Sequence, residues 1–129
     1  MKRFLIVDDQ AGWRNHNSNA VYHVIGDKAY IEKASSAQEG YSKLLESKNN
    51  PYDYLLTDMQ MESDYAPLMA GEWLIEQVQN LSFSYKTKII IISASPMIRY
   101  IAERYGVDYI SKANASISIE PYRELIVKI

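Results

Sequence analysis

The sequence predicts an α/β fold in which a five-stranded parallel sheet is doubly wound by helices. Continuous apolar runs at residues 4–7, 54–56 and 89–92 are typical of strands that are buried on both faces of a parallel sheet. Segments with helical spacing of their apolar residues alternate with these runs. Because parallel strands need crossover connections that lie on both faces of the sheet, this alternation favours a doubly wound architecture.

Five strands are expected in all. The three apolar runs supply the central ones, and residues 29–31 and 107–110 are shorter β-prone stretches that we interpret as flanking strands. For five strands and five helices the natural arrangement is the flavodoxin-like order 2-1-3-4-5. In that order the functional residues are expected at the carboxyl ends of strands one, three and four.

Five helices are expected between and after the strands. Helices are expected over residues 13–25, 37–45, 74–81, 98–105 and 122–129. Apolar residues at helical spacing indicate the last four, whereas the first is inferred mainly from its place between two strands. A capping box at residues 36–39 precedes the second, Ser95-Pro96 the fourth and Pro121 the fifth. The first is the weakest, because residues 15–19 are poor helix formers.

The length and composition of the chain exclude several classes of protein. A chain of 129 residues with 47% apolar residues is the size of one domain, which we expect to span residues 1–129. With 14 basic and 16 acidic residues there is no sign of direct nucleic-acid binding, and the absence of cysteine excludes disulfides. The first apolar run ends at Asp8 and Asp9, so it is neither a signal peptide nor a membrane span, and a cytoplasmic protein is expected.

Three aspartates follow two of the expected strands. Asp8 and Asp9 close the first strand and Asp58 closes the third, so the three should converge at one edge of the sheet. Their mutual repulsion would be relieved by a hard divalent cation, and Mg²⁺ is the expected ion. Such an ion takes few protein oxygens, here side chains together with the backbone carbonyl of Gln60.

A hydroxyl and an ammonium group complete the candidate site. Ser93 ends the fourth strand and Lys112 lies near the end of the fifth, so both should reach the pocket beside Asp58. Metal, lysine and hydroxyl together would neutralise the charge of a transferring phosphoryl group. Asp58 would then be the nucleophile that forms an aspartyl-phosphate.

Four short segments carry a resemblance that covers essentially the whole chain. They are Leu-Ile-Val-Asp-Asp at 5–9, Asp-Met-Gln-Met at 58–61, Ser-Ala at 93–94 and Tyr-Ile-Ser-Lys at 109–112. In this order, each at an expected strand end, they resemble the marker motifs of response-regulator receiver domains.

The resemblance implies a role for each matching residue. Asp58 would accept the phosphoryl group, with Asp9 binding Mg²⁺ directly and Asp8 assisting through water. Ser93 and Lys112 would read the modification. Tyr109 is similar to the switch aromatic of these domains, although a plain packing role is an equal alternative. Gln60 and Ser95 occupy positions that resemble those tuning the lifetime of the phosphorylated state.

The sequence also departs from the pattern. Ala113 follows Lys112 where receiver domains usually have proline. Gly71 matches a glycine that normally lies closer to the phosphoacceptor, which implies an insertion within residues 61–70.

The resemblance implies a signalling switch with protein partners. A sensor histidine kinase, a phosphotransfer protein or a small phosphodonor would load Asp58, and the surface of helix four, strand five and helix five would change its affinity for a downstream effector domain or protein. A homodimer through that surface is left open. The domain would catalyse only its own loading and hydrolysis and would not be a turnover enzyme.

Two alternatives remain. One is a pseudo-receiver, a phosphorylation-independent interaction module with the same fold. The other is a Mg²⁺-dependent phosphohydrolase, which is disfavoured because the end of strand one, Val-Asp-Asp-Gln at 7–10, lacks the alternating nucleophile and acid of such enzymes.

Overall fold

The structure is a computed structural model that describes residues 1–61 and 70–126. Along the chain the elements are β1 (Lys2–Val7), α1 (Ala11–Ile25), the 3₁₀ helix η1 (Gly26–Lys28), β2 (Ala29–Ala34), α2 (Ala37–Glu46), β3 (Tyr54–Thr57), α3 (Ala70–Asn80), the 3₁₀ helix η2 (Ser82–Ser84), β4 (Lys88–Ser93), α4 (Ile98–Tyr105), β5 (Asp108–Ser111), α5 (Lys112–Ile117) and α6 (Glu120–Leu125). Most of the expected insertion, residues 62–69, lies outside the described residues.

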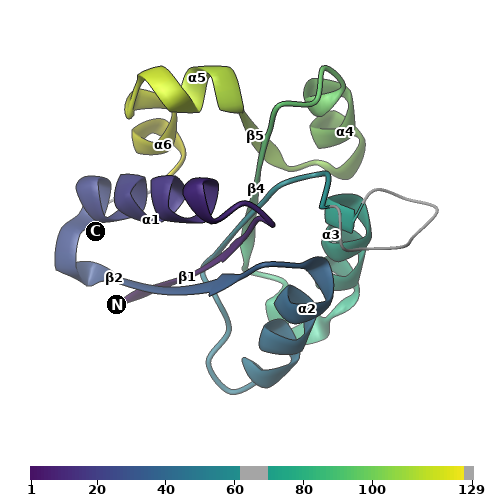
Figure 1. Cartoon of the computed structure of the whole chain (residues 1–129). Helices are drawn as coiled ribbons and strands as arrows, with labels where there is room; N and C mark the ends of the chain where they lie inside the picture. Colours follow the sequence, from purple (N-terminus) through teal and green to yellow (C-terminus); the bar gives the residue numbers. More distant parts are fainter. Residues whose placement is uncertain (62–69, 127–129) are drawn as a thin grey trace.

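The five strands form one parallel sheet in the order β2-β1-β3-β4-β5 (Figure 1). The predicted fold class and strand order are therefore confirmed. Register puts Val7 of β1 beside Thr57 of β3, and the Asp58 amide donates to the Val7 carbonyl at 3.1 Å. Asp8 and Asp58 consequently leave neighbouring strands at the same level of the sheet.

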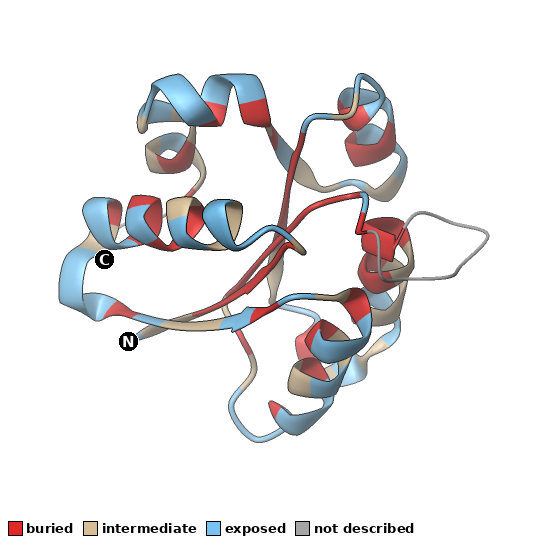
Figure 2. Cartoon of the chain, in the orientation of Figure 1, coloured by how far each residue is buried: buried red, intermediate tan, exposed pale blue. Residues whose placement is uncertain are grey.

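Helices cover both faces of the sheet (Figure 1). Phe4 and Ile6 of β1 pack toward α1, α5 and α6, whereas Leu5 and Val7 pack toward α2, α3 and α4. The central strands β1, β3 and β4 therefore contribute to two separate cores, which explains why they are apolar without alternation. Figure 2 shows these three strands largely in red, between helices whose outer sides are largely exposed.

The described part of the chain contains six α-helices rather than the expected five. The additional one is α5, which begins at Lys112 directly after β5. Its sequence, KANASI, is too short for a helical repeat of apolar residues to be visible. It is held by the Ser111 side chain, which accepts from the Asn114 amide, and by buried Ala115.

The boundaries of α4 agree with the prediction, whereas those of β2 differ. α4 spans Ile98–Tyr105, and Ser95 and Pro96 precede it in a turn in which the Ser95 side chain accepts from the Met97 amide. β2 extends three residues beyond the predicted stretch 29–31, to Ala34.

In the part of the chain that the structure describes, no helix is long and apolar enough to cross a bilayer.

α1 is a full helix of 15 residues in spite of its poor helix formers. Asn17 and Ser18 are buried, and Asn17 Oδ1 accepts a hydrogen bond from the Tyr122 hydroxyl of α6. The polar side chains that weaken the helix in isolation thus have tertiary partners. Packing in this way commonly overrides low intrinsic propensity.

A charged cluster ties β1, β2 and the start of β3 together at the opposite end of the sheet. The buried Tyr52 hydroxyl donates to Glu32 Oε2, and Arg3 lies with its guanidinium 4.6 Å from the Tyr52 ring centre and 3.8 Å from Glu32. The Tyr52 hydrogen bond is the main reason why the pKa of Glu32 is lowered.

Tyr52→Phe is expected to lower the free energy of unfolding by about 2 kcal/mol at pH 7, because a buried hydrogen bond to a carboxylate is lost. A carboxylate whose pKa is lowered by folding stabilises the protein above its unfolded pKa, ordinarily 4.5, and loses that effect as the pH falls through the folded value. The difference between wild type and variant should therefore shrink below that pH. Urea titrations from pH 3 to 7 measure it, with exposed Tyr22→Phe as the control. A pH-independent difference would contradict the charged hydrogen bond.

Candidate functional site

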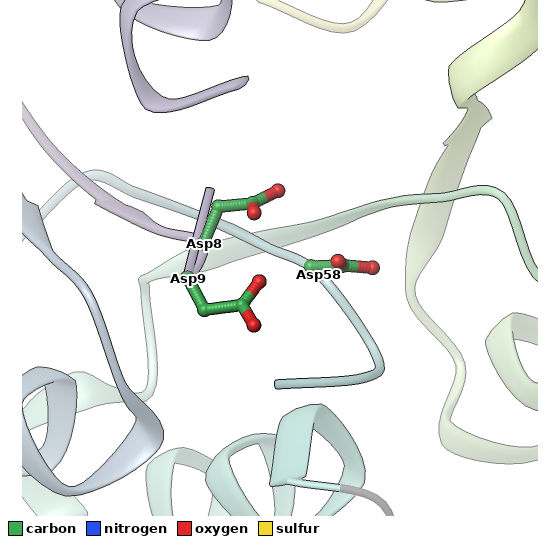
Figure 3. Close-up of side chains that lie close together, drawn as sticks. All are labelled: Asp8, Asp9 and Asp58. Atoms are coloured by element: carbon green, nitrogen blue, oxygen red, sulfur yellow. The ribbon is translucent and has the colours of Figure 1, made fainter. Parts of the chain in front are cut away.

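Three carboxylates meet at the carboxyl edge of the sheet. Asp8 and Asp9 follow β1, Asp58 follows β3, and one oxygen of each lies within 4.8 Å of the others. Figure 3 shows the three side chains projecting from the two neighbouring strand ends. Asp8 and Asp58 are buried, with 1% and 7% of their surfaces exposed, whereas Asp9 is half-buried.

A buried ammonium group bridges two of these acids. Lys112 Nζ lies 3.0 Å from Asp58 Oδ2 and 3.1 Å from Asp8 Oδ2. Lys112 reaches them because it stands at the first position of α5, immediately after β5. The predicted convergence of the ends of β1, β3 and β5 is thus present in the geometry.

Backbone amides fix the orientation of both buried acids. Asp58 Oδ1 accepts from the Met59 amide at 2.7 Å, and Asp8 Oδ1 accepts from the Gln10 amide at 2.9 Å. Each carboxylate therefore has one oxygen tied to its own loop and the other directed at Lys112.

The pKa of Asp8 reflects the close approach of these charged groups. Burial raises the pKa of Asp8, and the neighbouring Asp58 carboxylate adds to the shift, against the lowering effects of the Gln10 amide and Lys112. One lysine therefore does not offset the desolvation and repulsion that the Asp8 carboxylate experiences.

The donor set fits a hard divalent cation. Among the described residues Asp8 Oδ2 accepts no hydrogen bond, although it is buried and lies within ion-pair distance of Lys112. Carboxylate oxygens in such a cluster, with one half-buried and open to water, are the ligands that Mg²⁺ prefers. The nearby Gln60 is exposed and its backbone carbonyl belongs to the same loop.

A cavity of about 190 Å³ adjoins the acids. It is lined by Asp9, Gln10, Asp58, Gln60, Ser93, Ala94, Ser95 and Lys112. Ser93 is buried, and its Oγ accepts from the Ser95 amide at 3.1 Å. Five predicted site residues therefore share one cavity, and Asp8 joins them through Lys112. Tyr109 does not line it and is 39% exposed on β5.

The start of α3 lies very close to the backbone that follows Asp58, and Gly71 is the residue at this contact. Its amide donates to the Met59 carbonyl at 3.0 Å, and a Cβ at this position would lie 2.0 Å from the Asp58 carbonyl oxygen. Residue 71 must therefore be glycine for reasons of space.

Two residues of α1 also contact the site, although no motif in the sequence marks them. Arg14 Nη1 donates to the Asp8 carbonyl at 2.8 Å, and the Trp13 ring centre lies 5.0 Å from Lys112 Nζ. The only sequence signal for either is their position in the first turn of the helix that follows the acidic pair.

Solved structures of receiver domains resemble this chain over nearly its whole length. CheY4, a chemotaxis response regulator of Vibrio cholerae, shares 20% identity and a TM-score of 0.74 over 98% of this chain and 99% of that one. A CheY-like receiver domain protein of Methanospirillum hungatei shares 26% identity and a TM-score of 0.69, over 96% and 92%. The phosphorylated cyanobacterial phytochrome response regulator RcpA shares 15% identity and a TM-score of 0.76, over 96% and 90%.

No family model and no curated protein sequence matches the chain. The likeness therefore lies in the architecture, and it agrees with the strand order and with the acidic cluster at the carboxyl edge. The chain has the fold of the receiver domains of two-component response regulators.

Proposed function

We propose that residues 1–129 form a receiver domain that accepts a phosphoryl group on Asp58 in the presence of Mg²⁺ and thereby switches partner binding. The observation that supports this most is the buried Lys112 ammonium between Asp8 and Asp58, beside a cavity that Asp9 and Ser93 line. A structural ion pair would need only one acid. Three acids, a hydroxyl and a cation around open space suit a transferring phosphoryl group.

The chemistry would be a single displacement at phosphorus. A carboxylate oxygen of Asp58 attacks the phosphorus of a phosphohistidine or an acyl phosphate, the bond from phosphorus to the donor breaks, and the leaving group keeps the electron pair. Asp58 is then a mixed anhydride. Attack of water at phosphorus releases inorganic phosphate and restores the carboxylate, so the domain turns over only its own phosphoryl group.

Each residue around Asp58 would have a separate role in the transfer. Asp9, Asp58 and the Gln60 carbonyl would hold Mg²⁺, with Asp8 acting through water, and bound Mg²⁺ would supply positive charge to the phosphoryl oxygens. Lys112 would donate to a phosphoryl oxygen, since its ammonium already lies 3.0 Å from Asp58. The Ser93 hydroxyl, whose oxygen accepts from the Ser95 amide, would reorient toward the phosphoryl group.

The partners follow from this role. A sensor histidine kinase or a phosphotransfer protein would supply the phosphoryl group, and the face formed by α4, β5 and the following helices would contact the effector. Tyr109 is exposed on that face and is the candidate switch aromatic. We expect its rotamer to follow the Ser93 hydroxyl.

Intact mass after incubation with acetyl phosphate tests the proposal. Wild type should gain one phosphoryl group only when Mg²⁺ is present, and Asp58→Asn should gain none, because the amide is a poor nucleophile and a weaker metal ligand. Asp53→Asn is the matched control, since Asp53 lies at the other end of β3, where its Oδ2 accepts from the Arg3 amide away from the cavity. It should label like wild type.

Other results would overturn the phosphoacceptor role. Absence of an adduct together with absence of Mg²⁺ binding would favour the pseudo-receiver, whose fold is the same. Sustained hydrolysis of a phosphate ester at many turnovers per chain would favour a phosphohydrolase.

A further inference from the structure

We propose that Trp13 is a positioning residue for Lys112, holding the ammonium in the site by a cation–π contact from α1. The inference rests on the proposed function for its consequence, but the contact itself can be tested separately. Lys112 Nζ lies 5.0 Å from the Trp13 ring centre, within the range of a cation–π contact. The indole thus approaches the ammonium from the helix layer, while the acids approach it from the strand ends.

The indole is itself held in place. His16, one helical turn further along α1, packs edge-on to Trp13 with 5.0 Å between ring centres and 70° between ring planes. His16 Nε2 lies 2.8 Å from the Ala115 carbonyl of α5, and since a carbonyl only accepts, this nitrogen carries the proton. Trp13 and His16 therefore connect α1 both to the Lys112 side chain and to the helix that Lys112 begins.

This arrangement matters because lysine is a flexible chain that ends in a point charge. Before reaction its ammonium has two carboxylate partners, Asp8 and Asp58. Phosphorylation would convert one Asp58 oxygen to an anhydride and remove that carboxylate charge. The Trp13 contact does not depend on the state of Asp58, so it keeps the ammonium near the phosphoryl oxygens throughout the cycle.

A proton NMR measurement tests the contact without any phosphorylation. Ring current from Trp13 should shift the ε-methylene protons of Lys112 upfield of those of exposed lysines in wild type. The shift should disappear in Trp13→Leu and be smaller but present in Trp13→Phe, which preserves an aromatic face. Trp73→Phe is the matched control, because Trp73 packs on Tyr41 on the other face of the sheet and should leave the Lys112 signal unchanged.

Loading kinetics test the positioning role. Trp13→Leu should lower the rate constant for phosphorylation by acetyl phosphate roughly threefold to tenfold, with Mg²⁺ affinity unchanged, and Trp13→Phe should recover part of the loss. A purely structural role would not separate the leucine and phenylalanine variants in this way. If Trp13→Leu does not fold, the comparison of Trp13→Phe with Trp73→Phe still decides the question.

Two outcomes would overturn the inference. If the ε-methylene signal of Lys112 is not shifted in wild type, Trp13 does not contact the ammonium. If Trp13→Leu loses the shift but is still phosphorylated at the wild-type rate, the contact exists but does not position Lys112 for phosphorylation. A wild-type protein that takes no phosphoryl group at all would overturn the proposed function instead, and the NMR comparison would then decide the contact alone.

Discussion

Gly71→Ala should cost about 3 kcal/mol of the free energy of unfolding and should strongly slow the loading of Asp58. A methyl group at residue 71 would lie 2.0 Å from the Asp58 carbonyl oxygen and 2.7 Å from Met59 Cα. Both obstacles are backbone, so a side-chain rotation cannot relieve the clash, and such overpacking costs about 1–3 kcal/mol or more. The backbone that moves carries Asp58, the proposed nucleophile. Urea denaturation and acetyl phosphate labelling measure the two effects.

Gly12→Ala is the matched control. Gly12 and Gly71 are each the second residue of an α-helix, but nothing lies within 4 Å of a Cβ built at Gly12. Alanine is a better helix former than glycine by up to about 1 kcal/mol, so Gly12→Ala should stabilise slightly. Equal effects of the two substitutions would contradict the close approach of α3 to the loop after Asp58.

The strands were predictable because of how they are buried. Residues such as Ile6 and Leu55 have neighbours on both sides of the sheet, so every position of the strand must be apolar and the run is visible in the sequence. The strand order then followed from the count of alternating elements. The helices α1 and α5 were harder, since Asn17 finds its partner on α6 and α5 depends on its Ser111 cap.

The candidate site was predictable as far as topology determines it. Asp8 and Asp58 follow adjacent parallel strands, so their proximity needs no knowledge of side-chain packing. Trp13 was not predictable, because its contact with Lys112 depends on which side of α1 faces the start of α5. The ion pair between Lys112 and Asp8 likewise depends on a helix beginning at Lys112, where the sequence predicted only a strand end.

Lys112→Met should cost about 3 to 5 kcal/mol of the free energy of unfolding, which is typical when one partner of a buried ion pair is removed. The substitution preserves the apolar length of the side chain but leaves the Asp8 and Asp58 carboxylates buried and close to one another. Urea denaturation at pH 7 without divalent metal measures the loss. Lys88→Met is the control, because its ion pair with Asp108 is partly exposed, at 36% and 45%, and should contribute about 1 kcal/mol or less.

A double-mutant cycle with Asp8→Asn separates the charge effect from packing. If the loss arises from unpaired carboxylates, Lys112→Met should cost about 1 to 3 kcal/mol less in the Asp8→Asn background, because one of the two repelling charges is already gone. Additive effects would mean that Lys112 and Asp8 are not coupled. The loss would then come from packing of the Lys112 side chain or from its remaining ion pair with Asp58, whose carboxylate lies 3.0 Å from the ammonium.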